Sequence, residues 1–239
     1  MKGTRNLMHK RTLALVGAAS AAALATALSV SPALAAGSDT VLSWGAANPD
    51  GTDVATTDSL TGSLDSGSGV FTFDSNGTTV TISCSAASIV ADATSNPEAP
   101  GTADLTLSTL SFTGCTLTGL SGVTVKSITL ETAASAEVTD SPDDFVITSL
   151  NEAVKLAIPL GTLTCDYGTG TGASSITGAI TNPDSTGAGG SIAFDDAPVA
   201  YLSGGSVCGS SSNPGGFTAD FTAVSDSSGT GGNTAVYVN

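Results

Sequence analysis

Apolar and polar residues alternate along much of the chain, which is the pattern of β-strands with one buried face. Apolar residues occupy every second position from 154 to 160. The alternating runs 70–74 and 78–82 flank Asn76-Gly77, a dipeptide that favours a tight hairpin turn because it tolerates positive φ. Beyond residue 36 we find no helical periodicity. The sequence therefore predicts an all-β fold, either an antiparallel sandwich or a barrel-like stack of sheets.

In two of the expected strands, 104–112 and 122–131, the apolar residues move from odd to even positions midway. This phase slip indicates either a β-bulge, in which an extra residue lets the strand bend, or a break between two short strands. The remaining strands are expected over 41–44, 144–150, 190–195, 198–202, 217–224 and 233–238.

Residues 1–36 have the features of a secretory signal peptide: a basic start, an Ala/Leu-rich stretch and small residues at the cleavage site. An uncleaved membrane anchor is the alternative. The polar segment 37–66 is expected to be loosely attached, and 67–239 to form a single all-β domain. Within it, 70–150 and 151–239 each contain a Cys, an Asn-Pro and a second Cys, which suggests two half-repeats.

The chain has four cysteines, Cys84, Cys115, Cys165 and Cys208. An even number in an exported chain predicts disulfide bonds. Zinc is disfavoured because no two cysteines are close in sequence and the only His lies in the signal peptide. Three pairings are open, and the sequential one closes two local loops of comparable size.

Charge excludes several classes of function. The net charge is −15, and without residues 1–36 only Lys126 and Lys155 remain against all 21 acidic residues, a net charge of −19. Such a chain disfavours nucleic acid and anionic membranes, and no membrane insertion is expected after signal removal. A triad based on His is excluded as well. A cationic protein or an envelope polymer is the expected kind of partner.

The acidic residues offer two kinds of chemistry. Paired carboxylates are the remaining route to acid/base hydrolysis, and the candidates are Asp143-Asp144, Asp195-Asp196, Glu137 with Asp140, and Glu152. Calcium takes oxygen ligands from loops, and the weak candidates for such a site are Asp50, Asp53, Asp140, Asp143 and Asp144. No motif indicates another cofactor.

Two Thr-rich segments that end in a cysteine, 71–84 and 105–115, together with the signal, resemble a group of small exported proteins. These are Thr/Gly-rich all-β proteins with two Cys pairs from high-GC Gram-positive bacteria such as streptomycetes. The resemblance implies export and an all-β fold, but no activity. We therefore predict a secreted or envelope-associated, non-enzymatic binding or structural module. An extracellular hydrolase of glycosides or esters that uses paired carboxylates is the alternative.

Overall fold

The computed structural model describes residues 40–47, 50–65, 67–229 and 233–239, which belong to one compact unit. The signal peptide predicted over 1–36 lies outside the described residues. Among the residues that the structure describes, no helix combines the length and apolar character needed to cross a membrane. The described chain is nearly all β, as predicted, and its one short helical turn is the 3₁₀ helix η1 (Ser206–Cys208).

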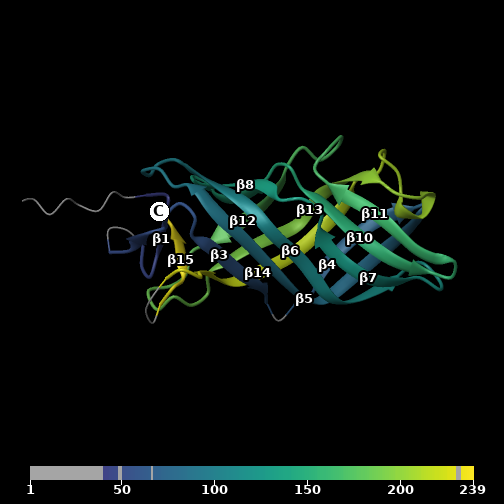
Figure 1. The fold of residues 1–239 in the computed structure, drawn as a ribbon, viewed down its shortest axis with the longest axis horizontal. Helices are drawn as coiled ribbons and strands as arrows, with labels where there is room; N and C mark the ends of the chain where they lie inside the picture. Colours follow the sequence, from purple (N-terminus) through teal and green to yellow (C-terminus); the bar gives the residue numbers. More distant parts are fainter. Residues whose placement is uncertain (1–39, 48–49, 66, 230–232) are drawn as a thin grey trace, which may run out of the picture. The chain divides into compact units, whose positions relative to one another are not determined.

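The strands form two antiparallel sheets (Figure 1). The small sheet contains β1 (Leu42–Trp44), β2 (Thr52–Asp53) and β15 (Val236–Val238). The large sheet contains β3 (Ser59–Leu64), β4 (Gly69–Ser75), β5 (Thr78–Ser95), β6 (Thr102–Thr118), β7 (Thr124–Leu130), β8 (Ala134–Asp140), β9 (Asp143–Ile147), β10 (Asn151–Ile158), β11 (Gly161–Gly168), β12 (Ile176–Thr181), β13 (Ser191–Ser203) and β14 (Gly215–Asp226).

The ladders of the large sheet close into two neighbouring rings. The first ring runs β4-β5-β6-β7-β10-β11-β13-β14 and returns to β4. The second ring runs β3-β5-β6-β8-β9-β12-β13-β14 and returns to β3. The long strands β5, β6, β13 and β14 belong to both rings. Each of the twelve strands has a partner on both sides, so the barrel-like arrangement leaves none of them as an edge for unwanted pairing.

The phase slips in the sequence correspond to β-bulges. In β6, the residues opposite Val90 and Ala91 are Thr109 and Leu107, so Ser108 is the extra residue. In β7, the residues opposite Lys155 and Leu156 are Ser127 and Val125, so Lys126 is the extra residue. Another bulge joins 190–195 and 198–202, predicted as two strands, into the single strand β13. Bulges bend strands and increase their twist, which suits strands that pass from one ring to the next.

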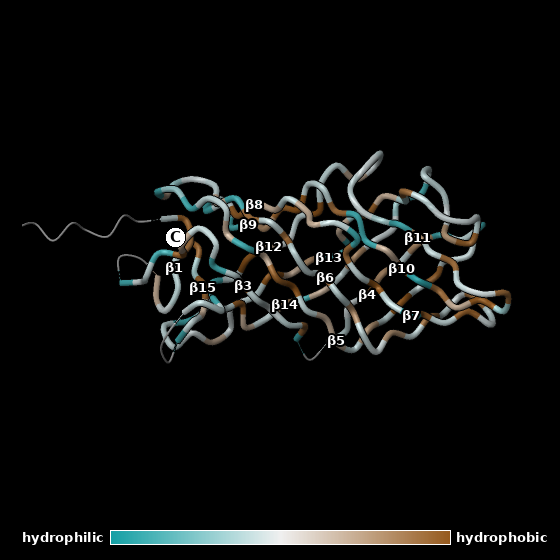
Figure 2. Tube along the Cα trace, viewed as in Figure 1, coloured by the Kyte–Doolittle hydropathy of each residue, from teal (hydrophilic) through white to brown (hydrophobic). Residues whose placement is uncertain are grey.

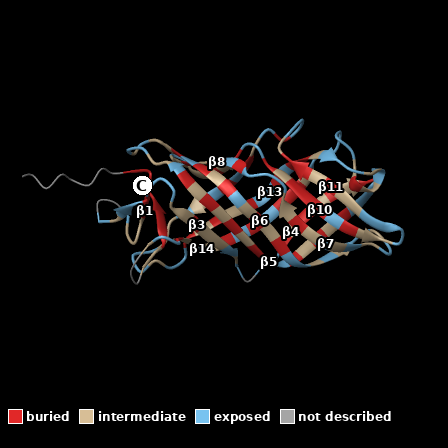
Figure 3. Ribbon diagram, viewed as in Figure 1, coloured by how far each residue is buried: buried red, intermediate tan, exposed pale blue. Residues whose placement is uncertain are grey.

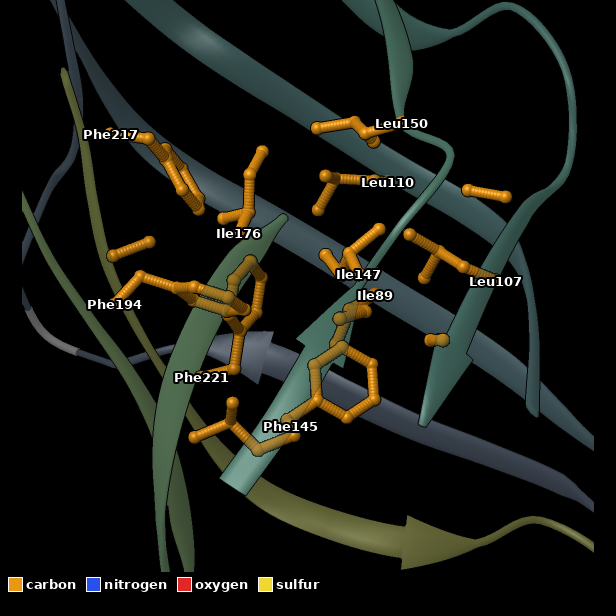
Figure 4. Close-up of a cluster of buried hydrophobic side chains, with 14 of the residues drawn as sticks. Ile89, Leu107, Leu110, Phe145, Ile147, Leu150, Ile176, Phe194, Phe217 and Phe221 are labelled. Carbon is orange, nitrogen blue, oxygen red and sulfur yellow. The ribbon is translucent and has the colours of Figure 1, made fainter. Parts of the chain in front are cut away.

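Alternate residues of the strands point inward and form an apolar core, as Figure 3 shows by alternating buried and exposed positions. Aromatic rings dominate part of it (Figure 4). Phe194 packs against Phe217 with ring centroids 5.1 Å apart, and against Phe145 edge-to-face at 6.3 Å. Such pairs add to the free energy of burial because ring edges and faces carry opposite partial charge.

The hairpin predicted around Asn76-Gly77 is confirmed. Both residues have positive φ, 53° and 84°, and Gly77 N donates to Asp74 Oδ1 at 2.9 Å. The segment 37–66 differs from the loose attachment that its composition suggested. Its described part includes β3, which pairs with both β5 and β14. β3, β8 and β12 were not predicted, because small residues such as Gly62 and Gly178 dilute their apolar alternation.

The small sheet, which we call the closing sheet, packs against the second ring. Leu42 of β1 lies opposite Val238 of β15. The side chain of Asn96 accepts from Leu42 N at 2.8 Å and donates to the carbonyls of Leu42 and Val54. At β15, the side chain of Asn182 donates to the Val238 carbonyl and accepts from Val238 N, both at 2.7 Å. Two Asn-Pro dipeptides thus supply side chains that extend the pairing of the closing sheet: Asn96 where β1 runs past the end of β2, and Asn182 along the outer strand β15.

We expect Asn96→Ala to lower the free energy of unfolding by about 2–3 kcal/mol, because it removes three hydrogen bonds to the backbone. Urea unfolding followed by the fluorescence of Trp44, the single Trp of the chain, measures this. Asn213→Ala is the matched control, since Asn213-Pro214 lies in an exposed loop. Equal losses in both variants would contradict the role of Asn96.

Candidate functional site

A row of hydroxyl side chains crosses seven neighbouring strands on the outside of the large sheet. We call it the hydroxyl belt. In order across β12, β13, β14, β3, β5, β6 and β7 it consists of Thr181, Ser191, Thr222, Ser63, Ser88, Ser111 and Thr129, each opposite the next. Neighbouring strands lie about 4.8 Å apart, so the belt presents hydroxyl groups at regular intervals.

The belt residues are exposed or half-buried, while the side chains that alternate with them, such as Phe221, Leu110 and Ile128, fill the core. Ser88 Oγ and Ser111 Oγ lie 2.9 Å apart and share a hydrogen bond. A hydroxyl group both donates and accepts hydrogen bonds and carries no charge. Because six of its seven strands belong to the eight-stranded second ring, the belt curves around that ring, and it suits a neutral, hydroxyl-rich polymer that follows this curve. A shorter row, Thr72, Thr81 and Thr118, crosses β4, β5 and β6.

The two disulfides join Cys84 to Cys115 and Cys165 to Cys208, the sequential pairing. The first links opposite positions of β5 and β6. The second ties η1 to β11, and Tyr167 OH donates to the carbonyl of Cys208 at 2.7 Å. Burial raises the pKa of Tyr167 above its ordinary value, and the nearby Tyr201 adds to this rise. The first bridge thus joins two paired strands and the second joins a strand to a loop helix, and the half-repeats stay a prediction.

The calcium candidates lie in two separate places. Asp53 is the last residue of β2 in the closing sheet, and Asp50 lies just before that strand. Thr40 Oγ1 donates to Asp53 Oδ1 at 2.8 Å. Asp140 and Asp143 are opposite each other at the β8–β9 turn, with Asp144 beside them, and Asp140 Oδ2 accepts from Gly101 N at 3.1 Å. The part of the chain described here holds no group of three or more His, Cys, Asp or Glu that could bind a metal ion. Calcium therefore stays a prediction.

The paired-carboxylate candidates are spread over the sheet. Asp143 and Asp144 are on β9, Glu137 and Asp140 on β8, and Asp195 and Asp196 at the bulge of β13. Glu152 on β10 differs from the others because it points into the first ring and only 2 % of it is exposed. Its strand neighbours are Tyr167 and Leu130.

Burial raises the pKa of Glu152 from 4.5 to about 8. Its Oε1 atom has no hydrogen-bond partner among the described residues. The carboxyl group is therefore mostly neutral at pH 7, and the core encloses it, which keeps it from a substrate in this conformation. We interpret Glu152 as a buried acid that affects stability, and hydrolysis by paired carboxylates stays an untested alternative.

A further acidic pair, Asp58 and Asp226, lies near the closing sheet and was not predicted from the sequence. Asp226 is 2 % exposed, and Ser228 N donates to its Oδ1 at 2.7 Å. Burial raises the pKa of Asp226, and the adjacent Asp58 carboxyl raises it further, although the Ser228 amide acts in the opposite direction. The two residues are 168 positions apart, and only the pairing of β3 with β14 brings them together.

An apolar cavity of about 40 Å³ lies between the closing sheet and the second ring. Leu42 and Val238 line it from the closing sheet, and Ile89, Leu105 and Phe145 from the ring. An engineered cavity that binds benzene is several times larger, about 150 Å³. This volume indicates incomplete packing rather than a site for a ligand of metabolite size.

Comparison of the whole chain with protein-family models, with curated proteins and with solved structures finds no match.

Proposed function

We propose that this is an exported, non-enzymatic module that binds a neutral polysaccharide of the cell envelope or its surroundings. The hydroxyl belt is the observation that carries the proposal. It runs across seven strands of one sheet at a fixed spacing, and the ring closure holds those strands in place. A rigid row loses little conformational entropy when it meets an extended polymer.

The charge of the chain favours a neutral partner. Acidic residues outnumber basic residues by 21 to 6 in the whole sequence, and many of them lie on strands of the second ring, so an anionic polymer along the belt would be repelled. The belt itself carries no charged side chain. An all-β chain with two disulfides is also compatible with an extracellular location, where disulfides persist. These features support export together with polymer binding.

The test is co-sedimentation of residues 37–239 with washed envelopes and with insoluble neutral polysaccharides. We expect retention that survives high salt, because hydrogen bonds between neutral groups are little screened. The double variant Ser63→Asp/Thr181→Asp should lower retention at least tenfold by adding charge at two exposed belt positions. Ser212→Asp, in the exposed β13–β14 loop, is the control.

Three results would contradict the proposal: no retention on any polymer, equal retention of all variants, or retention that disappears in high salt. The last result would indicate pairing of the acidic surface with a cationic partner. Adding calcium or a chelator in parallel tests the predicted calcium residues, since a site at Asp140 or Asp143 would make retention depend on the ion.

A further inference from the structure

An exposed apolar turn lies at the end of the first ring that is remote from the closing sheet. It joins β10 to β11 through Pro159 and Leu160. The side chain of Leu160 is 97 % exposed, and Leu202, at 38 %, is the other large apolar side chain exposed among the described residues. Isolated exposed leucines are ordinary, so the surroundings of Leu160 decide whether it has a role.

A second apolar loop accompanies this turn. The β6–β7 connection carries Leu120 and Val123, both partly exposed. A Cβ atom placed on Gly122 would lie 3.9 Å from Pro159 Cγ, so the two connections are in contact range. Figure 2 shows the hydrophobic colour gathered where β7, β10 and β11 end. We call Leu120, Val123, Pro159 and Leu160 the apolar tip.

Both lysines of the described chain lie on strands that lead away from the apolar tip. Lys126 on β7 and Lys155 on β10 are exposed. Lys126 Nζ donates to Thr162 Oγ1 at 2.7 Å, so its ammonium lies beside a residue only two positions from Leu160. In an extended strand two residues span about 7 Å, which is close to the depth of a lipid headgroup layer. Lys155 lies on β10, five residues before Leu160.

Few acidic groups oppose these lysines. Across β7, β10 and β11 the acidic residues are Glu152, which is buried and mostly neutral, and Asp166, which accepts a hydrogen bond from Ser203 Oγ. At the same end of the ring, Asp74 Oδ1 accepts a hydrogen bond from Gly77 N. Most other carboxylates belong to the second ring, the middle bulges and the closing sheet. Asp166 lies two positions along β11 from Thr164, the residue opposite Lys155, so its formal charge offsets that lysine. Charges beyond about 8 Å are largely screened at physiological ionic strength, so the positive charge at the tip is that of Lys126, which lies beside Thr162.

We propose that the apolar tip docks on an anionic lipid bilayer. Leu160 enters the boundary between headgroups and acyl chains, and Lys126 meets the headgroup phosphates. A second copy of the chain is a poorer partner, because two tips in contact would oppose lysine to lysine. This docking uses a different surface from the hydroxyl belt and stands independently of polysaccharide binding.

The experiment is co-sedimentation of residues 37–239 with phosphatidylcholine vesicles that contain or lack phosphatidylglycerol. We expect retention on the mixed vesicles and little on pure phosphatidylcholine. Leu160→Asp should weaken binding at least tenfold, because it removes the inserted side chain and adds a negative charge. Lys126→Gln should weaken it about fivefold and reduce the preference for phosphatidylglycerol.

Leu202→Asp is the matched control, since it alters the other exposed leucine, away from the tip, and it should bind as the unmodified chain does. Circular dichroism confirms that each variant is folded. Docking is overturned by no retention on mixed vesicles, by equal retention on both vesicle types, or by an unaffected Leu160→Asp variant. A change of oligomeric state in Leu160→Asp without a change in vesicle binding would instead assign the tip to self-association.

Discussion

The variant Glu152→Gln should be more stable than the unmodified chain by about 4 kcal/mol at pH 8, and close to it in stability at pH 4. Burial raises the pKa of Glu152 to about 8 in the folded protein, against 4.5 for the ordinary side chain. Between these two values the unfolded chain loses a proton that the folded chain keeps. Stability contributed by the neutral carboxyl is therefore complete below pH 4.5 and is lost as the pH rises to about 8.

Glutamine keeps the shape of the neutral acid and does not ionise, so it removes this loss. Urea unfolding at pH 4, 6 and 8 measures the effect, and the difference between variant and parent should grow with pH. Glu131→Gln makes the same change at an exposed position just beyond β7 and should leave stability nearly unchanged at each pH. A constant difference between pH 4 and pH 8 for Glu152→Gln would show that the carboxyl is not buried in solution.

Replacing the second disulfide, by Cys165→Ser with Cys208→Ser, should lower the free energy of unfolding by about 5 kcal/mol. The bridge spans 43 residues, and loss of that loop constraint alone costs about 4 kcal/mol. A further ~1 kcal/mol comes from the hydrogen bond that Tyr167 OH donates to the Cys208 carbonyl. That bond depends on η1 being held against β11.

The matched control is Cys84→Ser with Cys115→Ser. Its bridge spans 31 residues and joins two strands that already pair along most of their length, so only the constraint on the unfolded chain is lost, slightly below 4 kcal/mol. Urea unfolding of both double variants at one pH compares them directly. A greater loss in the Cys84/Cys115 variant would contradict the role assigned to η1 and Tyr167.

Features encoded by neighbouring residues could be predicted from the sequence. The turn at Asn76-Gly77 follows from the φ angles that those two residues tolerate. The bulges at Ser108 and Lys126 follow from a shift of apolar phase within a few positions. In each case the signal and its structural effect lie within about ten residues of chain.

Features that depend on register between distant strands could not be predicted. The hydroxyl belt runs through residues 63 to 222 in an order unrelated to their sequence order. Asp58 meets Asp226 only because β3 lies beside β14. Net charge is likewise an average over the chain, and it does not show that Lys126 and Lys155 lie on the neighbouring strands β7 and β10. Composition gives the number of such groups, and long-range pairing decides which of them become neighbours.

The four strands shared by both rings have a consequence for how the protein opens. Because β5, β6, β13 and β14 complete both closed ladders, neither ring can separate without exposing backbone amides of the other. Partial openings are then confined to turns and to the closing sheet, and amide protons in the shared strands exchange with solvent mainly through global unfolding. The same pairings join residues far apart in sequence, such as β4 with β14, so the chain must bring distant segments together early and should fold slowly. Because no single ring opens alone, we also expect unfolding to be slow.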